Sequence, residues 1–565
     1  MKRIVFLIIA TLLVIGLGLP GCGGGGGGAY VPWRALKTAG TLTIGVTGAM
    51  GYDQGLHAKY GAQLAATDVG SFAVGNQTLT VTIRAIETNE VLNPGGAGGT
   101  AAVSAEIANC DFMVGGFRTE GVLVYREPIM TANMTFFNCG AATEVLQNAV
   151  LVNYARYKWF FKATPPNEYL LSVMQSKLLG MCTAGLGAAN ASFVPKIALL
   201  AEDAEWTRVS REAAQAKFNT LGYNVSTTPW LVSPTSTNIG TTLGLITAAQ
   251  PDIVYTIFSG PVGVTYANTV GTYMPNVLTL GINVEAQRQE FPSSAAFANG
   301  MLFLDGWALG TNMTANTAKF VADFMAAHGG KWPIYTAATY DAVRTLAEAL
   351  QAEGYVEGST VKYVPEDIVS YLEGAIRTGT ASTSAVYPTW DGVTRGNYTP
   401  GYGSPAQLNL PALNQTQVLA LYPWLTSAVF VSPVTNVTYN WTYLPGQWTM
   451  PPVTVHDLVF GIRNATGATW ATGIGSQWQW NGTGLQKVCV FPKPYLFGTL
   501  LNITDMATWL ASVQFIPGAT MYKLQWKLGL WDQYGFWHWQ YPGTGTVNIT
   551  AWQTWMVGRW AGLPY

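Results

Sequence analysis

The sequence predicts an α/β protein made of two similar lobes, each built around a doubly wound parallel sheet. Strands alternate with helices from Thr41 onward, and the same alternation starts again at Pro195. Helical periodicity fades after about Gly379, so the pattern does not extend over the whole chain. A length of 565 residues leaves room for more than one domain.

The first lobe is predicted from strand–helix units between Thr41 and Asn138. Its strands are rich in β-branched residues, and apolar residues recur at helical spacing between them. The predicted strands are 41–47, 79–86, 111–115 and 134–138, with helices near 56–65, 100–108 and 121–126. Short strand–helix units in succession favour a parallel sheet covered by helices on both faces.

The second lobe repeats this construction. The predicted strands are 195–201, 224–228, 253–258, 277–281 and 301–304, with helices at 206–221, 266–273 and 340–350. Gly222 follows the first of these helices, at the position where a glycine commonly ends a helix. In such sheets ligands bind beyond the carboxyl ends of the strands, so we expect a crevice between the two lobes.

The C-terminal third has a different composition. Fifteen of the 21 tryptophans lie from Trp390 onward. We separate an insert, 381–452, from a Trp-rich extension, 494–565. The extension either packs on the lobes, binds a partner or glycan, or lies at a membrane interface.

Composition excludes several functions. Charged residues make up 10% of the chain and the net charge is −1, which argues against a nucleic-acid partner. No apolar stretch of membrane-spanning length occurs outside the N-terminus. Four scattered histidines and the absence of a CxxC motif predict no metal site, and we expect no cofactor.

The N-terminus, residues 1–28, reads as an export signal. Lys2 and Arg3 precede an apolar run, 4–19, and Gly21-Cys22 leads into a glycine tether. This order resembles a lipoprotein signal, in which Cys22 becomes the lipidated first residue, although Pro20 departs from the usual pattern. A plain signal peptide or an uncleaved anchor is the alternative.

The chain carries an excess of Asn-x-Ser/Thr sequons, which predicts N-glycosylation outside the cell. They begin at Asn76, Asn133, Asn190, Asn224, Asn312, Asn397, Asn414, Asn436, Asn440, Asn464, Asn481, Asn502 and Asn548. Together with the lipoprotein signal, they favour an archaeal cell surface over a bacterial periplasm. Cys110 and Cys139 each border a predicted strand, and either pair in a disulfide or remain buried thiols.

Eight segments, in order, resemble one family. They are TLTIGVTGAM…GAQLAATDV, DFMVGGFRTEG, FFNCGAATEVL, FFKATPPNEY, KIALLAEDAEW, PDIVYTIFSG, ANGMLFLDGW and YTAATYDAVRTLAEAL. This order is similar to the type I periplasmic binding proteins, and within them to the leucine/isoleucine/valine-binding branch of ABC importers. The later segment VHDLVFG…TGIGSQWQWNGTGLQKVCVFP resembles the closing strands of archaeal members.

The resemblance implies a Venus-flytrap whose lobes close on a small solute. Lobe 1 would comprise 41–160 with about 287–355, and lobe 2 would comprise 161–286 with about 356–380 and 453–493. Crossovers are expected near 155–165, 283–290 and 355–380. The implied function is an extracellular binding protein that delivers branched-chain or other hydrophobic amino acids, or related amides, to an ABC permease.

The resemblance also implies where a ligand carboxylate would bind. The two loops after the third and fourth strands of lobe 1 match at Thr119, Gly140, Ala141 and Thr143, and helix-terminal N–H groups there favour an anion. Thr119 as a simple helix N-cap is the alternative. Arg118 and Glu120 depart from the family pattern, and either pair with each other or recognise a different ligand.

On the opposite lobe, Glu285 matches the family's acid for a ligand ammonium, with Asn283 as the alternative. Trp206 stands where the family places an aromatic residue over the ligand, and a core role is equally open. Ser259 follows a predicted strand and is a further candidate. Tyr52 and Asp53 are expected at the mouth of the crevice.

No catalytic role is predicted. The sequence contains no GxSxG, Walker, GxGxxG or HExxH motif in a fitting context. The alternative to a transport binding protein is a surface-layer-associated or sensory protein that reuses the same fold, because fold alone does not fix function.

Overall fold

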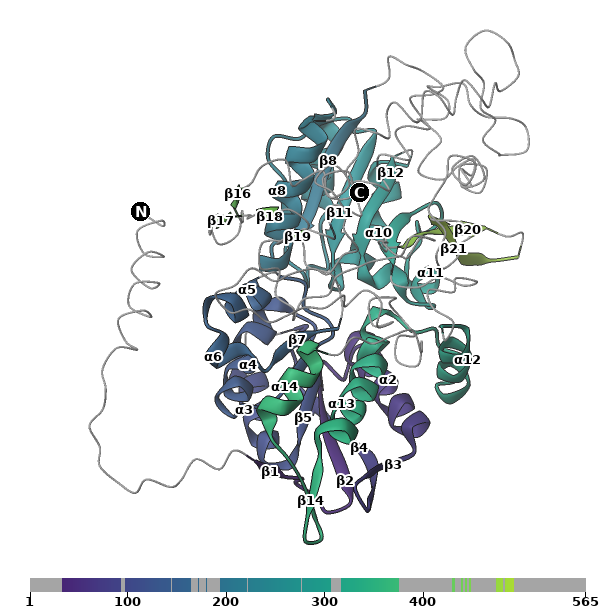
Figure 1. Cartoon of the computed structure of the whole chain (residues 1–565). Coiled ribbons are helices and arrows are strands. Elements are labelled where there is room, and N and C mark those ends of the chain that lie inside the picture. Colours follow the sequence, from purple (N-terminus) through teal and green to yellow (C-terminus); the bar gives the residue numbers. More distant parts are fainter. Residues whose placement is uncertain are drawn as a thin grey trace.

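The computed structural model of the chain describes residues 33–92, 97–143, 145–163, 194–220, 222–275, 277–305 and 317–374, the single residues Leu171 and Leu179, and parts of 429–491. Figure 1 shows two α/β lobes, one drawn mainly in purple and green and the other in teal. We call them lobe 1 and lobe 2. The predicted fold class, two parallel-sheet lobes, is confirmed.

The sheet of lobe 1, as far as the structure describes the chain, has six strands. In spatial order they are β3 (Ser71–Val74), β4 (Gln77–Glu87), β2 (Thr41–Gly48), β5 (Phe112–Gly115), β6 (Phe136–Asn138) and β7 (Phe160–Lys162). All neighbours are parallel except β3 and β4. The central strand β2 is buried from Leu42 to Gly48, as expected for a strand covered on both faces. Strands β3 and β7 were not predicted.

Helices cover both faces of this sheet. They are α2 (Asp53–Val69), α3 (Ala97–Glu106), η1 (Ile107–Asn109), α4 (Thr119–Thr131), α5 (Val145–Val152), α6 (Tyr154–Tyr157), α12 (Thr317–Ala327), η3 (Tyr335–Ala338), α13 (Thr339–Glu353) and α14 (Pro365–Gly374). Helix α13 packs along α2, and α3 packs along α4 on the opposite face (Figure 1).

The sheet of lobe 2 contains strands that lie far apart in the sequence. In spatial order they are β10 (Trp230–Val232), β8 (Lys196–Glu202), β11 (Ile253–Phe258), β12 (Leu278–Asn283), β13 (Leu302–Asp305), β20 (Ile474–Trp480) and β21 (Leu485–Phe491), and β9 (Asn224–Val225) also pairs with β8. Strands β8 to β13 pair in parallel, whereas β20 and β21 are antiparallel. The strand predicted at 224–228 is the shorter β9, and β10 was not predicted.

Alternate residues of β8 serve two cores. Leu199 faces the side that carries Phe218 of α8 (Glu205–Thr220). Leu200 faces the side that carries Leu243 and Tyr266. That second side holds α9 (Gly240–Ala248), α10 (Val262–Tyr273), η2 (Val284–Gln287) and α11 (Phe291–Ser294).

Smaller antiparallel elements complete the described chain. A three-stranded ribbon contains β1 (Arg34–Ala35), β15 (Thr360–Tyr363) and β14 (Tyr355–Glu357). Two short hairpins lie within or at the edge of the predicted insert: β16 (Val429–Val431) with β17 (Thr438–Asn440), and β18 (Tyr443–Leu444) with β19 (Gln447–Trp448).

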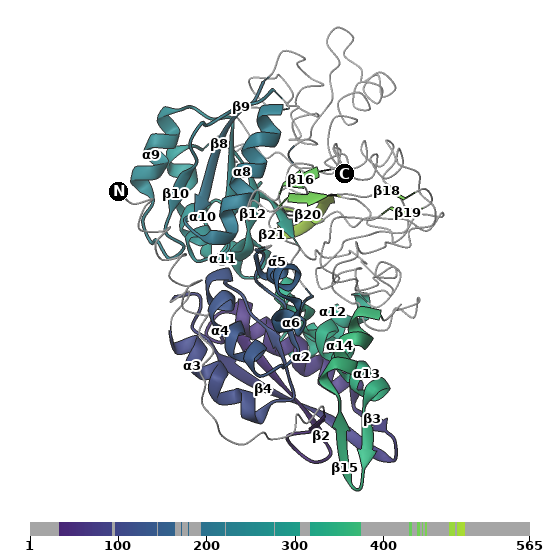
Figure 2. The same ribbon diagram turned by 60° about the vertical axis from the view of Figure 1, so that its left-hand side comes forward.

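Two segments lie in the opposite lobe from the one expected. Residues 287–305 contain β13, which pairs with β12 in lobe 2 rather than joining lobe 1. Residues 356–374 contain α14, which packs on α13 of lobe 1 (Figure 2). The second connection therefore runs from Asp305 to Thr317, not near 283–290. Periodicity identifies a strand but not which of two similar sheets it joins.

The cysteine pair considered from the sequence does not form. Cys110 and Cys139 are both buried free thiols. Cys110 precedes β5, whereas Cys139 follows β6, and the parallel register places Cys139 level with Gly116. Six steps of extended chain, from 110 to 116, span roughly 20 Å, whereas bridged cysteines need Cα atoms within about 7 Å.

Several sequence expectations lie outside the described residues. These are the leader 1–28 with Cys22, and the extension 494–565. Among the described helices, none has the length and apolar character needed to cross a membrane.

Candidate functional site

The carboxyl ends of the parallel strands in the two lobes face each other across the boundary between the lobes (Figure 1). Within the described residues, three hydrogen-bonded pairs of side chains cross this boundary: Arg118 with Glu202, Gln54 with Glu285, and Arg288 with Asp53. Ligands of open α/β sheets bind at such strand ends, which makes this boundary the candidate site.

The first pair is a buried ion pair. Arg118 stands at the N-cap of α4, and Glu202 ends β8. Arg118 Nη1 lies 2.8 Å from Glu202 Oε2, and the side chains are 1% and 0% exposed. Gly260 makes this approach possible, because a Cβ there would lie 2.3 Å from Arg118 Nη2.

Glu202 is held by its own lobe as well as by Arg118. Its Oε1 accepts hydrogen bonds from the backbone N–H groups of Ser259, at 2.7 Å, and of Gly260. Its Oε2 accepts from the Ser259 hydroxyl at 2.9 Å. The Ser259 hydroxyl, a predicted ligand contact, is thus engaged with an acid. These hydrogen bonds anchor the Glu202 carboxylate within lobe 2.

Several donors around this ion pair have no hydrogen-bond partner in the described part of the chain. They are Arg118 Nε and Nη2, Thr119 Oγ1 and Trp206 Nε1. Thr119 is 1% exposed and begins α4, and Trp206 is 5% exposed in the first turn of α8. Trp206 also belongs to the hydrophobic core, which was the alternative interpretation.

A buried acid, Glu90, accepts a hydrogen bond from the backbone of the Arg118 loop. Glu90 Oε2 accepts the Arg118 backbone N–H at 2.9 Å, and Glu90 Oε1 accepts the Thr88 hydroxyl at 2.8 Å. Burial raises the pKa of Glu90 to about 7 despite these hydrogen bonds. The sequence analysis did not single out Glu90.

We expect Glu90 to make folding stability depend on pH. Its pKa is raised from 4.5 to about 7 in the folded protein. Its contribution to stability is therefore fully present below about pH 4.5 and lost as the pH rises through about 7. Glu90→Gln should remove that loss, so relative to wild type it should gain stability between pH 5 and pH 8, by up to about 3 kcal/mol.

Urea unfolding of both proteins at pH 5 and pH 8 measures this difference. Glu212→Gln, which changes an acid on the surface of α8, is the matched control and should leave the pH dependence unaltered. A Glu90→Gln variant that follows the wild-type pH curve would show that the carboxyl titrates as it does in the unfolded chain.

The second interlobe cluster holds Glu285, the predicted partner of a ligand ammonium. Its Oε1 accepts from Gln54 at 2.8 Å, and its Oε2 lies 2.8 Å from Arg288. Arg288 also contacts Asp53 at 2.9 Å, and Lys331 lies 3.5 Å from Asp53. Glu285 is therefore already neutralised by an arginine, which the sequence analysis did not anticipate.

Burial raises the pKa of Glu285. Arg288 and Gln54 lower it, but their effect is smaller, so the pKa is raised overall. For Asp53, burial also works to raise the pKa, but the hydrogen bond from Arg288 and the nearby positive charges outweigh it and lower the pKa overall. Burial lowers the pKa of His57, beside Asp53, to about 4. We therefore expect His57 to be neutral at physiological pH.

The second predicted carboxylate loop, 139–143, is buried and supports the Arg118 loop by backbone packing. A Cβ on Gly140 would lie 1.8 Å from the Gly116 carbonyl oxygen. The Ala141 carbonyl accepts from Asn138 Nδ2 at 2.7 Å, and Thr143 Oγ1 accepts from the Val145 N–H at 3.3 Å.

The remaining predicted residues flank the boundary. Tyr52 is partly buried at the N-cap of α2, directly before Asp53. Asn283 ends β12, where its Nδ2 donates to the Gly263 carbonyl at 3.2 Å and its Oδ1 has no partner among the described residues.

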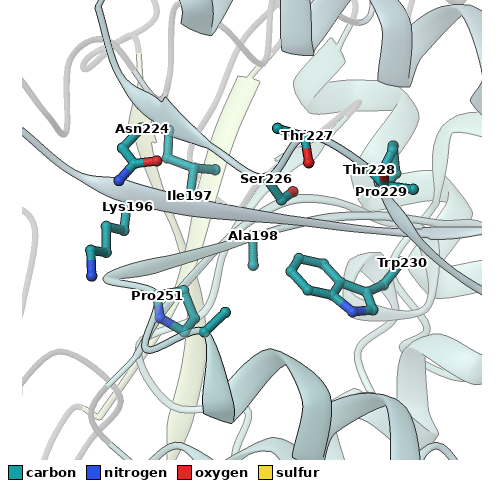
Figure 3. A pocket seen from close by; sticks show the side chains of 11 residues that line it. Lys196, Ile197, Ala198, Asn224, Ser226, Thr227, Thr228, Pro229, Trp230 and Pro251 are labelled. Carbon is teal, nitrogen blue, oxygen red and sulfur yellow. The ribbon is translucent and has the colours of Figure 1, made fainter.

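A separate cavity of about 430 Å³ lies on lobe 2 (Figure 3). It lies between Lys196, at the amino end of β8, and Trp230, and Asn224 and Pro251 also contribute. Lys196 and Glu202 stand at opposite ends of β8, roughly 20 Å apart at the usual rise of a strand. The cavity therefore does not belong to the interlobe site.

Within the described residues, no cluster of three His, Cys, Asp or Glu side chains has the arrangement needed to hold a metal ion. The site chemistry present is charge pairing and hydrogen bonding across two lobes. Such an arrangement can bind a small polar or charged molecule between them.

Comparisons with known proteins agree with this fold. The sequence pattern of a periplasmic binding protein family matches residues 42–381. A search of curated protein sequences gave no match. Among solved structures, a protein from Silicibacter pomeroyi described as a putative branched-chain amino acid ABC transporter is 15% identical, with a TM-score of 0.50, covering 80% of this chain and 97% of its own.

Two further structures are similar. A solute-binding protein of an ABC transporter from R. palustris, in complex with benzoate, is 11% identical with a TM-score of 0.49, covering 80% and 96% of the two chains. A leucine-binding protein from Thermotoga maritima is 15% identical with a TM-score of 0.49, covering 62% and 92%. The match over 42–381 spans more than half of the sequence, and the chain therefore belongs to the periplasmic binding protein family.

Proposed function

We propose that this chain is the solute-binding protein of an ABC importer, which binds a small molecule reversibly between its lobes and delivers it to a membrane permease without chemical turnover. Membership of the family supports this proposal. The observation that carries it is the set of three side-chain pairs that join the facing strand ends of the two lobes. A solute held there would contact both lobes, so its binding would favour their closure.

The solute classes supported by the sequence resemblance are branched-chain or other hydrophobic amino acids and related amides. A thermal-shift screen of such compounds on the mature chain, residues 22–565, tests the proposal. A true ligand at 100 times its dissociation constant should stabilise the protein by about 2.7 kcal/mol. Small-angle scattering should show a smaller radius of gyration when ligand saturates the protein.

Stabilisation without any change in radius would argue against closure on a solute. In that case a sensory or surface-layer-associated role, the alternative from the sequence, would be the better account. Trp33 and Leu245 are exposed apolar side chains. Scattered residues of this kind are usual on protein surfaces, so they do not distinguish between these roles.

We further propose that the mature chain is tethered through Cys22 on the outer side of the membrane and carries N-glycans. Among the described sequon asparagines, Asn76, Asn133 and Asn224 are exposed, as glycosylation requires. Detergent-phase partitioning of the mature chain should be lost in Cys22→Ala. Unchanged partitioning of that variant would rule out the lipid anchor.

A further inference from the structure

Arg118 presents an unused pair of donors at the interlobe site. Among the described residues, only Nη1 of its guanidinium is hydrogen-bonded to a side chain, that of Glu202. Nε and Nη2 are buried without a partner among the described residues, although the side chain is 1% exposed. Buried donors of a charged group are costly when unpaired, and the Nε–Nη2 edge has the fork geometry that fits a carboxylate.

The surroundings of that edge also favour an anion. Arg118 is the N-cap of α4, a helix of 13 residues, and its own side chain makes no capping hydrogen bond, although the Glu90 carboxyl accepts its backbone N–H. The amino end of a helix carries partial positive charge. Thr119 adds a hydroxyl that is buried and lacks a partner in the described chain. Two arginine donors, a hydroxyl and a helix terminus thus occur together.

Two acids at the same boundary are already paired with donors of the protein. Glu202 accepts from Arg118, from Ser259 twice and from Gly260. Glu285 is paired with Arg288. A ligand ammonium would therefore compete with protein donors at either acid.

Glu120 is the acid at this boundary that has a carboxylate oxygen without a hydrogen-bond donor among the described residues. Its Oε1 accepts the Glu205 N–H at the start of α8, where the helix terminus offsets its charge. Its Oε2 has no partner among the described residues. A ligand ammonium bound at Glu120 is thus the competing arrangement.

We propose that the solute is a carboxylic acid without an ammonium group, and that the Nε–Nη2 edge of Arg118, helped by Thr119, binds its carboxylate. This inference rests on the proposed function and names the ligand class of that site. It replaces the zwitterionic ligand expected from the sequence, for which Glu285 was to be the second contact.

Four compounds with one carbon skeleton test it on the mature chain by calorimetric titration. They are leucine, 4-methylpentanoate, leucinamide and 4-methylpentanamide, which carry or lack the carboxylate and the ammonium independently. Benzoate and benzamide repeat the carboxylate comparison on an aromatic skeleton. We expect binding by 4-methylpentanoate, benzoate or both, with the matching amides and leucinamide at least about 10-fold weaker.

Arg118→Lys keeps the positive charge opposite Glu202 but removes the two-donor edge. It should weaken carboxylate binding about 10- to 100-fold. Arg208→Lys is the matched control, because Arg208 pairs with acids of its own helix, and should leave affinity unchanged. The melting temperature of each ligand-free variant shows whether it is folded.

The outcomes separate this inference from the proposed function. Tight binding of leucine, leucinamide or an amide, unaffected by Arg118→Lys, would overturn the inference but leave the solute-binding function standing. Carboxylate binding with wild-type affinity in Arg118→Lys would also overturn it. If none of the six compounds binds, the result counts against both.

Discussion

Lys487→Met should lower the free energy of unfolding by about 3–5 kcal/mol, because it removes the positive charge that pairs with the buried Asp305 carboxylate. Lys487 Nζ lies 2.8 Å from Asp305 Oδ2, and the side chains are 0% and 1% exposed. Nζ also donates to the Gln287 carbonyl at 3.0 Å. Methionine fills a similar volume, so the change in the free energy of unfolding should come from the lost charge rather than from lost packing.

The position of Lys487 explains why this effect should reach the whole of lobe 2. Lys487 lies on β21, whereas Asp305 ends β13, where the chain leaves for lobe 1. Ser476 of β20 donates to the same Asp305 oxygen at 3.0 Å. The ion pair thus joins the β20–β21 hairpin, residues 474–491, to the sheet that residues 196–305 form.

Urea unfolding followed by circular dichroism measures the loss. Lys319→Met is the control: Lys319 pairs with Asp323 on the surface of α12, and its loss should cost less than about 0.5 kcal/mol. The double variant Lys487→Met/Asp305→Asn should lose less than Lys487→Met alone, because no buried charge is left unpaired. Equal losses for Lys487→Met and Lys319→Met would contradict the account.

The fold class could be predicted because burial and backbone periodicity act locally. The strand predicted at 253–258 is β11 with the same bounds, and Gly222, with φ of 73°, follows α8 as a helix-ending glycine should. Strand β7 has only three residues and β3 is partly exposed, so neither gave a clear pattern. Assignment of β13 and α14 to lobes depends on contacts between distant segments, which periodicity does not encode.

The candidate site could be predicted only in part for a related reason. Loops after parallel strands meet at one edge, so Ser259 was found from its place after a strand, whereas Thr119 and Arg118 came from comparison with the family's carboxylate loop. That Glu202 pairs with Arg118 depends on how the two lobes are placed relative to each other. The pairing of Glu285 with Arg288 had a sequence signal, since the two residues are three positions apart. Nothing local distinguished Glu90 from other acids in a loop.

Glu202→Gln should shift the ligand-free protein toward an open arrangement of the lobes. Glutamine keeps the shape of the side chain, and its oxygen can still accept from Ser259 and Gly260. Its amide nitrogen, however, would face Arg118 Nη1, so two donors oppose each other where an ion pair stood. In the closed arrangement Arg118 would be buried and unpaired, which costs about 3–5 kcal/mol.

An effect of that size is enough to change the populated state. We expect ligand-free wild type to populate both arrangements, so that ligand can still close it. Complete reversal of a 99:1 equilibrium takes about 5.5 kcal/mol, so a loss of about 3–5 kcal/mol makes the closed arrangement a minor state. Opening also lets water solvate Arg118. Small-angle scattering should therefore give a larger radius of gyration for ligand-free Glu202→Gln than for wild type. Glu212→Gln, an exposed acid on α8, should match wild type.

Arg118→Met should open the protein less than Glu202→Gln does. Without Arg118, Glu202 still accepts three hydrogen bonds from Ser259 and Gly260 of its own lobe. Without Glu202, Arg118 has no side-chain acceptor among the described residues. Arg118 is thus the buried charge that has no substitute partner. Opening of the lobes exposes it to water, which stabilises the open arrangement of Glu202→Gln more than that of Arg118→Met. Equal radii for wild type and Glu202→Gln would mean that this ion pair does not hold the lobes together.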